Sequence, residues 1–273
     1  MELQPNVITL GVTDLDEAKR FYTEGLGLPI LEDEGQFVSL GLGDGSSGLA
    51  LYHRDALAHD AGVPADGTGF RRVTLSYITD SAEHVDGLLS QAIAAGGRLV
   101  KPAKRAVWGG YSGNVADPDG HIWKVASGNG PPRLRRRSTP AVSAPSAPLE
   151  VPVVIGVADV KRAKAFYEAL GSPVGKSFGG KYVSFAFPGG SDLALYKTGD
   201  LADDAGVDAD GRGFRAVTFS HLVDSAAEVD EVIDRATHAG ATVVKPAEAA
   251  SWGGYGGYIA DLDGFLWKVV SAS

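Results

Sequence analysis

The chain contains the same sequence twice. The segment Gly48–Ser76, GLALYHRDALAHDAGVPADGTGFRRVTLS, returns 144 residues later as Asp192–Ser220, DLALYKTGDLADDAGVDADGRGFRAVTFS. The flanks repeat as well, with Gly11–Gly27 matching Gly156–Gly171 and Val100–Ser127 matching Val244–Ser271. A unit of roughly 125 residues is too long for a solenoid repeat and has the size of a self-sufficient domain. The chain is therefore a tandem duplication, and the positions at which the copies differ are the informative ones.

Composition excludes several classes of function. The 273 residues are 44% hydrophobic, enough for two cores, and their net charge of −9 is spread along both copies. Nucleic-acid surfaces need clustered Lys and Arg. The one basic run, Arg133–Arg137, lies among Pro, Ser and Ala residues, where we expect a solvated linker. Without cysteine there is no disulfide and no thiolate site. We expect no signal peptide, because the first residues, MELQPNVITLGV, lack a basic start and a long apolar stretch, and we expect no membrane span, because no apolar run approaches ~20 residues. We expect a cytoplasmic protein with no nucleic-acid or membrane partner.

The domain boundaries follow from a change in composition. Residues 127–149 are rich in Pro, Ser and Arg and nearly free of large apolar side chains, which is typical of an extended linker. We expect a first module over residues 1–126, this linker, and a second module over residues 150–273. A linker of this length lets the two modules pack on each other as a pseudo-dimer, since tethering raises their effective concentration.

Within each copy, one pattern of elements occurs twice. In the first copy, alternation over residues 6–12 predicts a strand, and Asp14 predicts the N-cap of a helix that ends at Gly25 and Gly27. Three short strands follow, and residues 54–69 are predicted to form a long polar loop. The pattern then repeats, with a helix capped by Ser81 and a closing hairpin at the turn Asp117–Gly120. The predicted order is βαβββ twice in each copy.

The helix motif GVxDLxxAxxFYxxGLG and the hairpin ADPDGHxWKV of the first copy resemble the vicinal oxygen chelate superfamily, and they return in the second copy as GVADVKRAKAFYEALG and ADLDGFLWKV. That superfamily includes glyoxalase I, extradiol dioxygenases and the bleomycin-binding resistance proteins. The resemblance implies an α+β fold of tandem modules, each of two βαβββ units that curl into a cup-shaped mixed sheet with the helices outside. It also implies a ligand on the concave face of the sheet.

Metal-dependent enzymes of this superfamily hold one divalent ion through the first, fourth, fifth and eighth strands. Such an ion needs imidazole or carboxylate ligands. The equivalent positions in this chain hold other residue types: Val7, Leu49, Arg72 and Lys124 in the first copy, and Pro152, Leu193, Ala216 and Lys268 in the second. We therefore expect no metal and no other cofactor in either cup.

Side-chain alternation predicts which residues line the cups. Lys124 points inward if it replaces a ligand, so Trp123 faces the helices. Pairing Gly113 with Lys124 across the hairpin places Tyr111 on the inner face. The candidate catalytic residues are His53, Arg72 and Lys124. The candidate ligand-binding residues are Leu51, Thr74, Trp108, Tyr111, Lys197, Trp252, Tyr255 and Lys268. Residues that recur in both copies, such as the tryptophans, also suit plain core packing. Arg72, which becomes Ala216, is the inner charge that differs between copies.

Several functions remain open at this point. The first is a metal-independent protein that binds a small organic molecule, aromatic or bearing carbonyl or carboxylate groups, in the manner of a natural product. It either sequesters an antibiotic without catalysis or carries out proton transfer, isomerisation or cyclisation, with His53 moving the proton. The second is a metal-dependent lyase or dioxygenase with relocated ligands. The third is a scaffold whose cups are closed and inert. Fold alone does not choose among these.

Overall fold

The computed structural model describes residues 2–43, 47–106, 110–128, 148, 150–250 and 253–272. The first copy contains β1 (Val7–Val12), α1 (Leu15–Arg20), the π-helix η1 (Phe21–Gly25), β2 (Ile30–Asp33), β3 (Phe37–Leu40), β4 (Gly48–His53), α2 (Arg54–Ala61), β5 (Gly67–Gly69), β6 (Val73–Thr79), α3 (Ala82–Ala94), β7 (Arg98–Arg105), β8 (Tyr111–Ala116) and β9 (Ile122–Ser127). The second contains β10 (Val153–Val157), α4 (Val160–Ala169), β11 (Val174–Ser177), β12 (Tyr182–Phe185), β13 (Leu193–Lys197), α5 (Thr198–Ala205), β14 (Gly211–Gly213), β15 (Val217–Val223), α6 (Ala226–His238), β16 (Thr242–Ala249), β17 (Tyr255–Ala260) and β18 (Leu266–Ser271).

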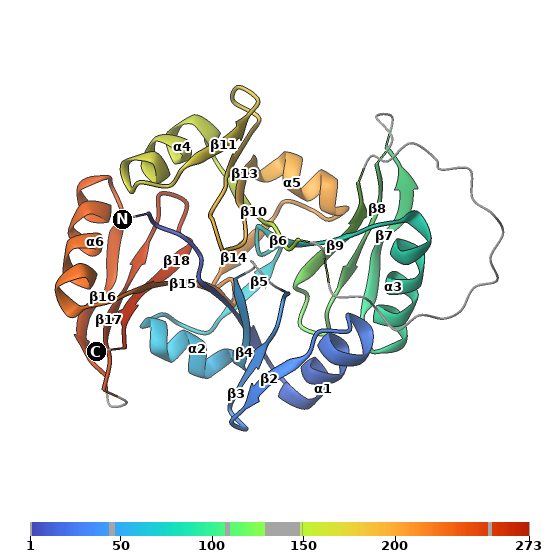
Figure 1. Cartoon of the computed structure of the whole chain (residues 1–273), viewed down its shortest axis with the longest axis horizontal. Coiled ribbons are helices and arrows are strands. Elements are labelled where there is room, and N and C mark those ends of the chain that lie inside the picture. The colour runs from blue at the N-terminus through green and yellow to red at the C-terminus, as the bar shows by residue number, and fades with distance from the viewer. Residues whose placement is uncertain are drawn as a thin grey trace.

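The two large sheets are each built from both copies (Figure 1). Sheet I has the strand order β16-β17-β18-β15-β1-β4-β3-β2, and sheet II has the order β11-β12-β13-β10-β6-β9-β8-β7. The predicted fold class, tandem βαβββ units in an α+β arrangement, is confirmed. The sequence pattern, however, predicted two cups that are each lined by residues of a single copy. That grouping is wrong, because the first half of one copy shares its sheet with the second half of the other.

Two antiparallel strand pairs join the copies. In sheet I, β1 pairs with β15 in a register that sets Ile8 opposite Phe219. In sheet II, β10 pairs with β6 and sets Val153 opposite Leu75. Parallel neighbours flank both pairs, β4 and β18 in sheet I and β13 and β9 in sheet II. Because backbone ladders run continuously across both junctions, the two copies fold around shared sheets.

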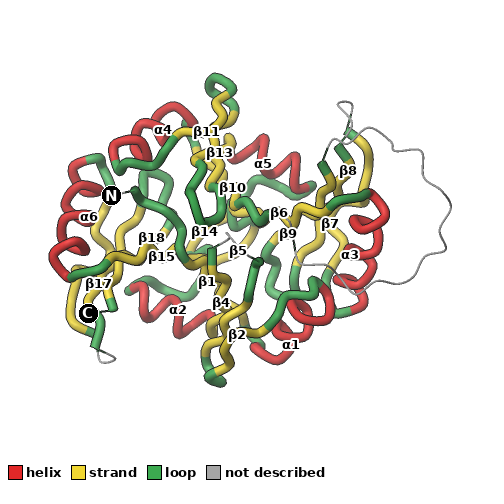
Figure 2. The backbone as a smooth tube through the Cα atoms, in the orientation of Figure 1, coloured by secondary structure: helices red, strands yellow, loops and turns green. Residues whose placement is uncertain are grey.

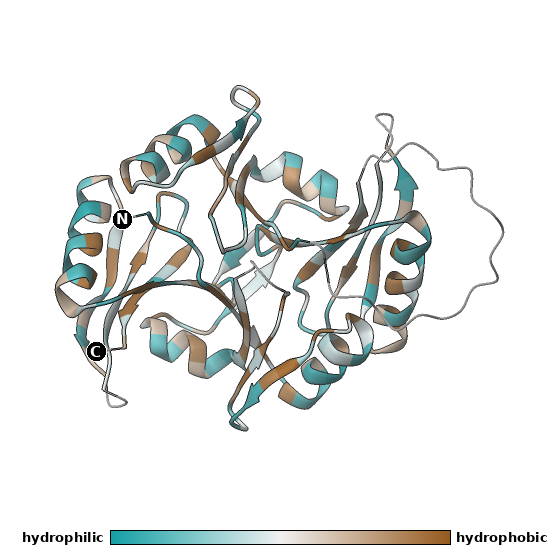
Figure 3. Cartoon of the chain, in the orientation of Figure 1, coloured by the Kyte–Doolittle hydropathy of each residue, from teal (hydrophilic) through white to brown (hydrophobic). Residues whose placement is uncertain are grey.

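The outer face of each sheet carries the long amphipathic helices. Helices α3 and α6 lie against the β7–β9 and β16–β18 strands, and hydrophobic and hydrophilic residues alternate along them (Figures 2 and 3). The core beneath them contains Trp123 and Trp267, both fully buried, and Trp123 meets Tyr22 edge-on at 5.9 Å. The predicted N-caps are confirmed, since Asp14 accepts hydrogen bonds from Asp16 and Glu17, and Ser81 accepts one from His84. Among the described residues, no helix is long and apolar enough to cross a membrane.

The segment predicted as a loop over residues 54–69 instead contains a helix and a short strand. Helix α2 ends at Ala61 and is capped by Gly62, whose φ of 72° is the left-handed conformation that favours glycine. Strand β5 then pairs antiparallel with its counterpart β14, so that Thr68 faces Arg212 on the pseudo-two-fold axis. The loop prediction was wrong because charged and small residues dominate the segment, leaving only a narrow apolar stripe. The signal was its recurrence, since LAxxAG appears in both copies.

Candidate functional site

The inner faces of the two sheets, opposite the long helices, are each partly filled by a short helix. Helix α2 lies on sheet I and α5 lies on sheet II. Their apolar stripes are buried against the inner face, where Leu57, Ala58 and Ala61 pack with Tyr258 and Leu266, and Leu201, Ala202 and Ala205 pack with Phe70 and Ile122. Each cup is therefore filled at its centre, and cavities lie toward its β7–β8 or β16–β17 end.

A carboxylate on each of these helices neutralises the lysine on the facing strand. In sheet II, Lys124 Nζ lies 2.7 Å from Asp204 Oδ2. In sheet I, Lys268 Nζ lies 2.7 Å from Asp60 Oδ2. A partly buried ammonium group needs such a partner, and the partner comes from the other copy in both cases. The predicted inward direction of the two lysines agrees with this geometry.

The two helices share one lysine contact and differ in another, since Lys245 Nζ donates to the carbonyl oxygen of Asp60 at 3.4 Å as Lys101 does to that of Asp204. At the last turn of α5, Asn114 Nδ2 donates to the carbonyl oxygens of Asp204 and Ala205 at 2.8 and 3.0 Å. Lys101 Nζ donates to the carbonyl oxygen of Asp204 at 2.8 Å. These donors satisfy helix-end carbonyls that have no partner within the helix. The equivalent of Asn114 in sheet I is Tyr258, whose hydroxyl donates to Asp60 Oδ2 at 2.5 Å.

The charge on Asp60 is fixed by these contacts. Burial alone raises the pKa of Asp60, but the hydrogen bonds from Lys268 and Tyr258 outweigh it and hold that pKa below its usual value. Burial, followed by the nearby negative charge of Asp60, raises the pKa of Tyr258. Tyr258 therefore stays protonated and acts as a hydrogen-bond donor.

An open cavity remains beside each inner helix, and the two cavities differ in charge. The sheet II cavity, about 450 Å³, is lined by Lys101, Lys104, Arg105, Lys124 and a single acid, Asp204. The sheet I cavity, about 290 Å³, is lined by two bases and two acids: Lys245, Lys268, Asp60 and Glu248. Because Lys245 also pairs with Glu248 at 3.3 Å, the sheet I cavity is balanced while the sheet II cavity carries an excess of positive charge.

Two of the predicted inner residues lie on the opposite face. The hairpin pairs Asn114, not Gly113, with Lys124. A shift of one residue moves every side chain of a strand to the other face. The hydroxyl of Tyr111 therefore donates to Asp86 of α3 at 2.8 Å, and that of Tyr255 donates to Asp230 of α6 at 3.0 Å. Sequence reasoning missed Asn114 and Tyr258, the residues that face inward at these positions.

The fourth strand shows the same error. Leu51 is fully buried in the outer core, in line with Leu10, so its prediction as an inner residue is wrong. His53 and Lys197 stand exposed at the strand ends that precede α2 and α5, and neither lines the two cavities. Thr74 shares the inner face with Ile122, as predicted. Trp108 and Trp252 lie outside the described residues.

Arg72 directly precedes β6 of sheet II, whereas His53 is the last residue of β4 in sheet I. The two residues therefore lie in different cups. Arg72 has a φ of 58°, a left-handed conformation shared by Ala216 at 52°. Its side chain lines a third cavity between the copies.

The residues of the inner faces do not fit a divalent metal ion. Lys268 stands in one row with Ser220, Val7 and Gly48 across the four central strands of sheet I. Lysine brings positive charge to that row, and valine and glycine offer no side-chain ligand. Among the described residues, no group of three or more His, Asp and Glu side chains converges in a way that could hold a metal.

Comparisons with known proteins agree with this fold. The family model described as glyoxalase/bleomycin resistance protein/dioxygenase superfamily matches residues 4–125 and 151–269. The glyoxalase I structure from Zea mays superposes with a TM-score of 0.64 and 19% identity, covering 98% of this chain and 92% of that one. A putative dioxygenase from Bacillus subtilis gives a TM-score of 0.62 at 14% identity, covering 99% of this chain and 86% of that one. At these identities the likeness concerns the fold alone.

A sequence relative is the Caenorhabditis elegans protein described as Glyoxalase 1. It is 28% identical over 86 residues, which is 31% of this chain and 28% of that protein. The match thus spans less than a third of the relative's length. Because the family model covers nearly all of both copies, the chain belongs to the glyoxalase/bleomycin resistance protein/dioxygenase superfamily.

Proposed function

We propose that the sheet II cavity binds a small organic anion and does so without a metal ion. The observation that carries this proposal is the charge difference between two otherwise equivalent cavities. Lys104 and Arg105 of β7 stand where β16 has Glu248 and Ala249. The inner side of the sheet II cavity thereby gains the ammonium group of Lys104 where the sheet I cavity has the carboxylate of Glu248, and the one acid among its described lining residues, Asp204, is paired with Lys124.

The size and chemistry of the cavity suit an organic ligand that carries a carboxylate or enolate. Its volume of about 450 Å³ lies within the usual range for small-molecule sites. Arg105 pairs with Tyr111 across β7 and β8, and its guanidinium stands 5.7 Å from the ring centroid of that tyrosine, so the two side chains meet on the α3 side of the sheet, where Asp86 holds the Tyr111 hydroxyl. Ala126 contributes apolar surface. Cationic groups at one end and apolar surface at the other match a molecule with an acid group on an apolar body.

Binding without catalysis is the form of this proposal that the geometry favours. The one carboxylate among the described lining residues, Asp204, is already paired with Lys124. His53, the residue expected to move a proton, lies at the end of β4 in the other sheet. A general base must reach the proton that it removes. Metal-independent sequestration therefore fits this cavity better than proton transfer.

The experiment exchanges the charges of the two cavities. A thermal-shift screen compares aromatic carboxylates with their neutral amides, and the best ligand is titrated by calorimetry with and without a chelator. Lys104→Glu with Arg105→Ala gives sheet II the residues of sheet I, and we expect affinity to fall ten- to a hundredfold, since each lost charge-assisted hydrogen bond contributes roughly 1.5–3 kcal/mol. The matched variant, Glu248→Lys with Ala249→Arg, leaves the sheet II affinity unchanged. Equal stabilisation by amides, equal affinity of the first variant, or loss of binding with chelator would overturn the proposal.

A further inference from the structure

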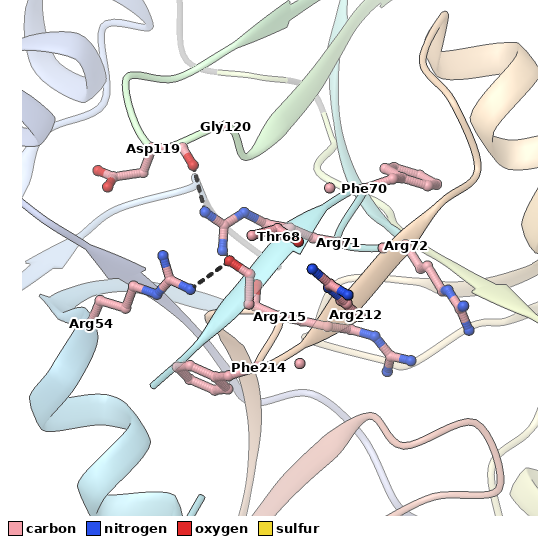
Figure 4. A pocket seen from close by; sticks show the side chains of 14 residues that line it. Arg54, Thr68, Phe70, Arg71, Arg72, Asp119, Gly120, Arg212, Phe214 and Arg215 are labelled. Atoms are coloured by element: carbon pink, nitrogen blue, oxygen red, sulfur yellow. Dashed lines mark hydrogen bonds between the residues drawn. The ribbon is translucent and has the colours of Figure 1, made fainter. Parts of the chain in front are cut away.

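The third cavity, of about 410 Å³, lies between the two copies, outside both cups (Figure 4). Five arginines line it: Arg54, Arg71, Arg72, Arg212 and Arg215. The one carboxylate of the lining, Asp119, accepts hydrogen bonds from the backbone nitrogen and hydroxyl of Thr13 at 2.9 and 2.6 Å. In Figure 4 this carboxylate points away from the arginines. The cavity is therefore strongly positive.

A ribbon of glycines forms one wall of the cavity. Strands β5 and β14 approach so closely that a Cβ added at Gly67 or Gly211 would overlap the carbonyl oxygen of Phe214 or Phe70. Only glycine allows this approach. The ribbon fixes the two copies of the sequence GFR next to each other and so places arginines from both copies around one space.

The arginines of this cavity are bound to backbone carbonyls rather than to carboxylates. Arg71 Nη1 donates to the carbonyl of Arg215 at 2.8 Å, and Arg54 Nη2 donates to that of Gly67 at 2.9 Å. Arg215 Nη2 donates to the carbonyl of Asp263 at 2.7 Å. Among the described residues, none of the five arginines forms an ion pair, and Arg54 Nε and Arg215 Nη1 are buried without a hydrogen-bond partner. Buried guanidinium groups are costly to the fold unless a counter-charge offsets them, and the acids that act on Arg71 and Arg215, Asp117 and Asp261, do so without forming an ion pair with them.

Both copies contribute arginines to this cavity, although not every one of these arginines has an arginine at the equivalent position of the other copy. Thr198 takes the place of Arg54 in the second copy, and Ala216 takes the place of Arg72. Burial lowers the pKa of Arg71 and of Arg215. The carboxyls of Asp117 and Asp261 oppose this shift, and a neighbouring arginine adds to it, Arg54 for the first and Arg72 for the second. Each buried arginine thus has a second guanidinium beside it, and Arg212 stands between the two pairs in Figure 4.

We propose that this inter-copy cavity binds a small phosphate-bearing anion. Arginine presents a planar fork of N–H donors that matches phosphate oxygens bidentately. A water molecule takes about 30 Å³ in the liquid, so the cavity holds a group larger than one tetrahedral oxyanion. An anion here would meet Arg54, Arg72 and Arg212 and would offset the repulsion among all five guanidinium groups. This site is separate from the sheet II cavity, and neither proposal depends on the other.

The chain itself supplies the substitutions for a test. Arg54→Thr, Arg72→Ala and Arg212→Thr each replace an arginine with the residue that the other copy holds at the equivalent position. Alanine at position 72 is compatible with the left-handed backbone, because Ala216 adopts it already. Arg162→Gln, on the exposed surface of α4, is the matched control for the loss of one positive charge.

Calorimetry with inorganic pyrophosphate as the probe, at fixed ionic strength, measures the affinity of the full chain. We expect pyrophosphate to bind at least tenfold more tightly than sulfate, each single variant to lose about tenfold, and the triple variant to lose binding, while Arg162→Gln binds like the wild type. Inorganic phosphate and glycerol 3-phosphate, run in parallel, distinguish a free anion from a phosphate ester.

Two results overturn the proposal: pyrophosphate that binds no more tightly than sulfate, or a triple variant with unchanged affinity. If the triple variant does not fold by circular dichroism, Arg212→Thr alone decides the question. Arg212 is exposed on β14, and its side chain makes no hydrogen bond to another described residue. Unchanged affinity of a folded Arg212→Thr protein would then refute the assignment.

Discussion

Lys124 of the first copy and Asp204 of the second are 80 residues apart in the chain, yet Nζ and Oδ2 lie 2.7 Å from each other. The pair fastens α5 to a strand of the opposite copy. Its side chains are 29% and 43% exposed, so solvent screens the attraction in part.

A double-mutant cycle on this pair measures what the contact contributes. We expect Lys124→Met and Asp204→Asn to show a coupling energy of about 1 kcal/mol in urea unfolding, because the pair is partly shielded from water. The control cycle uses Lys164 and Glu168, an i,i+4 pair within α4 at 3.4 Å whose side chains are similarly exposed, at 32% and 45%. We expect a coupling of at most ~0.5 kcal/mol there, because this longer contact lies within one helix. Equal coupling in both cycles would show that the helix position does not depend on the Lys124 contact.

A buried carboxyl makes stability depend on pH near neutrality. Burial raises the pKa of Asp117 to about 7, and Asp117 accepts hydrogen bonds from Tyr22 at 2.8 Å and from the backbone of His121 at 2.7 Å. The folded state therefore holds a proton that the unfolded state releases near pH 4, so the associated stability is full below pH 4 and lost as pH rises through 7.

We expect Asp117→Asn to gain stability relative to wild type as pH rises from 4 to 8, on the order of a few kcal/mol. Urea unfolding at several pH values measures this difference. Asp119→Asn, in the same turn but with an exposed carboxylate bound to Thr13, serves as the control. A pH-independent difference between Asp117→Asn and the wild type would contradict the assignment.

The glycine ribbon between the copies should be intolerant of any side chain. Gly211→Ala places a Cβ against the carbonyl oxygen of Phe70, so we expect unfolding at lower temperature by several degrees or more. Gly87→Ala provides the opposite case, since that position in α3 has open space around it and alanine favours the helix by roughly 1 kcal/mol. Differential scanning calorimetry of both variants checks the pair. A Gly211→Ala protein as stable as wild type would show that β5 and β14 separate at little cost.

Cutting the chain between the copies should not separate them. Both large sheets contain strands from each copy, so we expect a protein with an engineered protease site between residues 129 and 147 to elute as one particle after complete cleavage. Size-exclusion chromatography in native buffer, with a denatured sample as the reference, measures this. Two separate fragments in native buffer would contradict the shared-sheet arrangement.

The sequence predicted the elements better than their pairing. Glycine stops and the caps at Asp14 and Ser81 are local signals, and they placed the helices correctly. The partner that a strand pairs with is decided by contacts between residues far apart in the sequence. Because β6 and β15 carry the same motif, the sequence did not show that β1 pairs with β15 of the other copy and not with β6 of its own. The prediction that Tyr111 faces the inside of the cup was wrong for a different reason. Facing residues alternate with a period of two, so one residue of error at the Asp117–Gly120 turn reversed the whole strand.

The charge partners of Lys124 and Lys268 were beyond prediction as well. Asp204 and Asp60 lie on helices that the sequence analysis took for a loop, and an acidic residue in a polar segment looks the same whether it faces water or a buried lysine. Leu, Ala and Gly recur at helical spacing in both copies, and this signal for a helix becomes visible only when the two copies are aligned with each other.

The shared sheets also have an evolutionary meaning. In a symmetric dimer of single modules, every substitution appears in both cups at once, so the two sites must stay identical. Here each cup takes its strands once from each copy, and a change such as glutamate to lysine at the position of Lys104 and Glu248 alters one cup only. In a single chain that carries both modules, the charge of one cavity can therefore change while that of the other is kept.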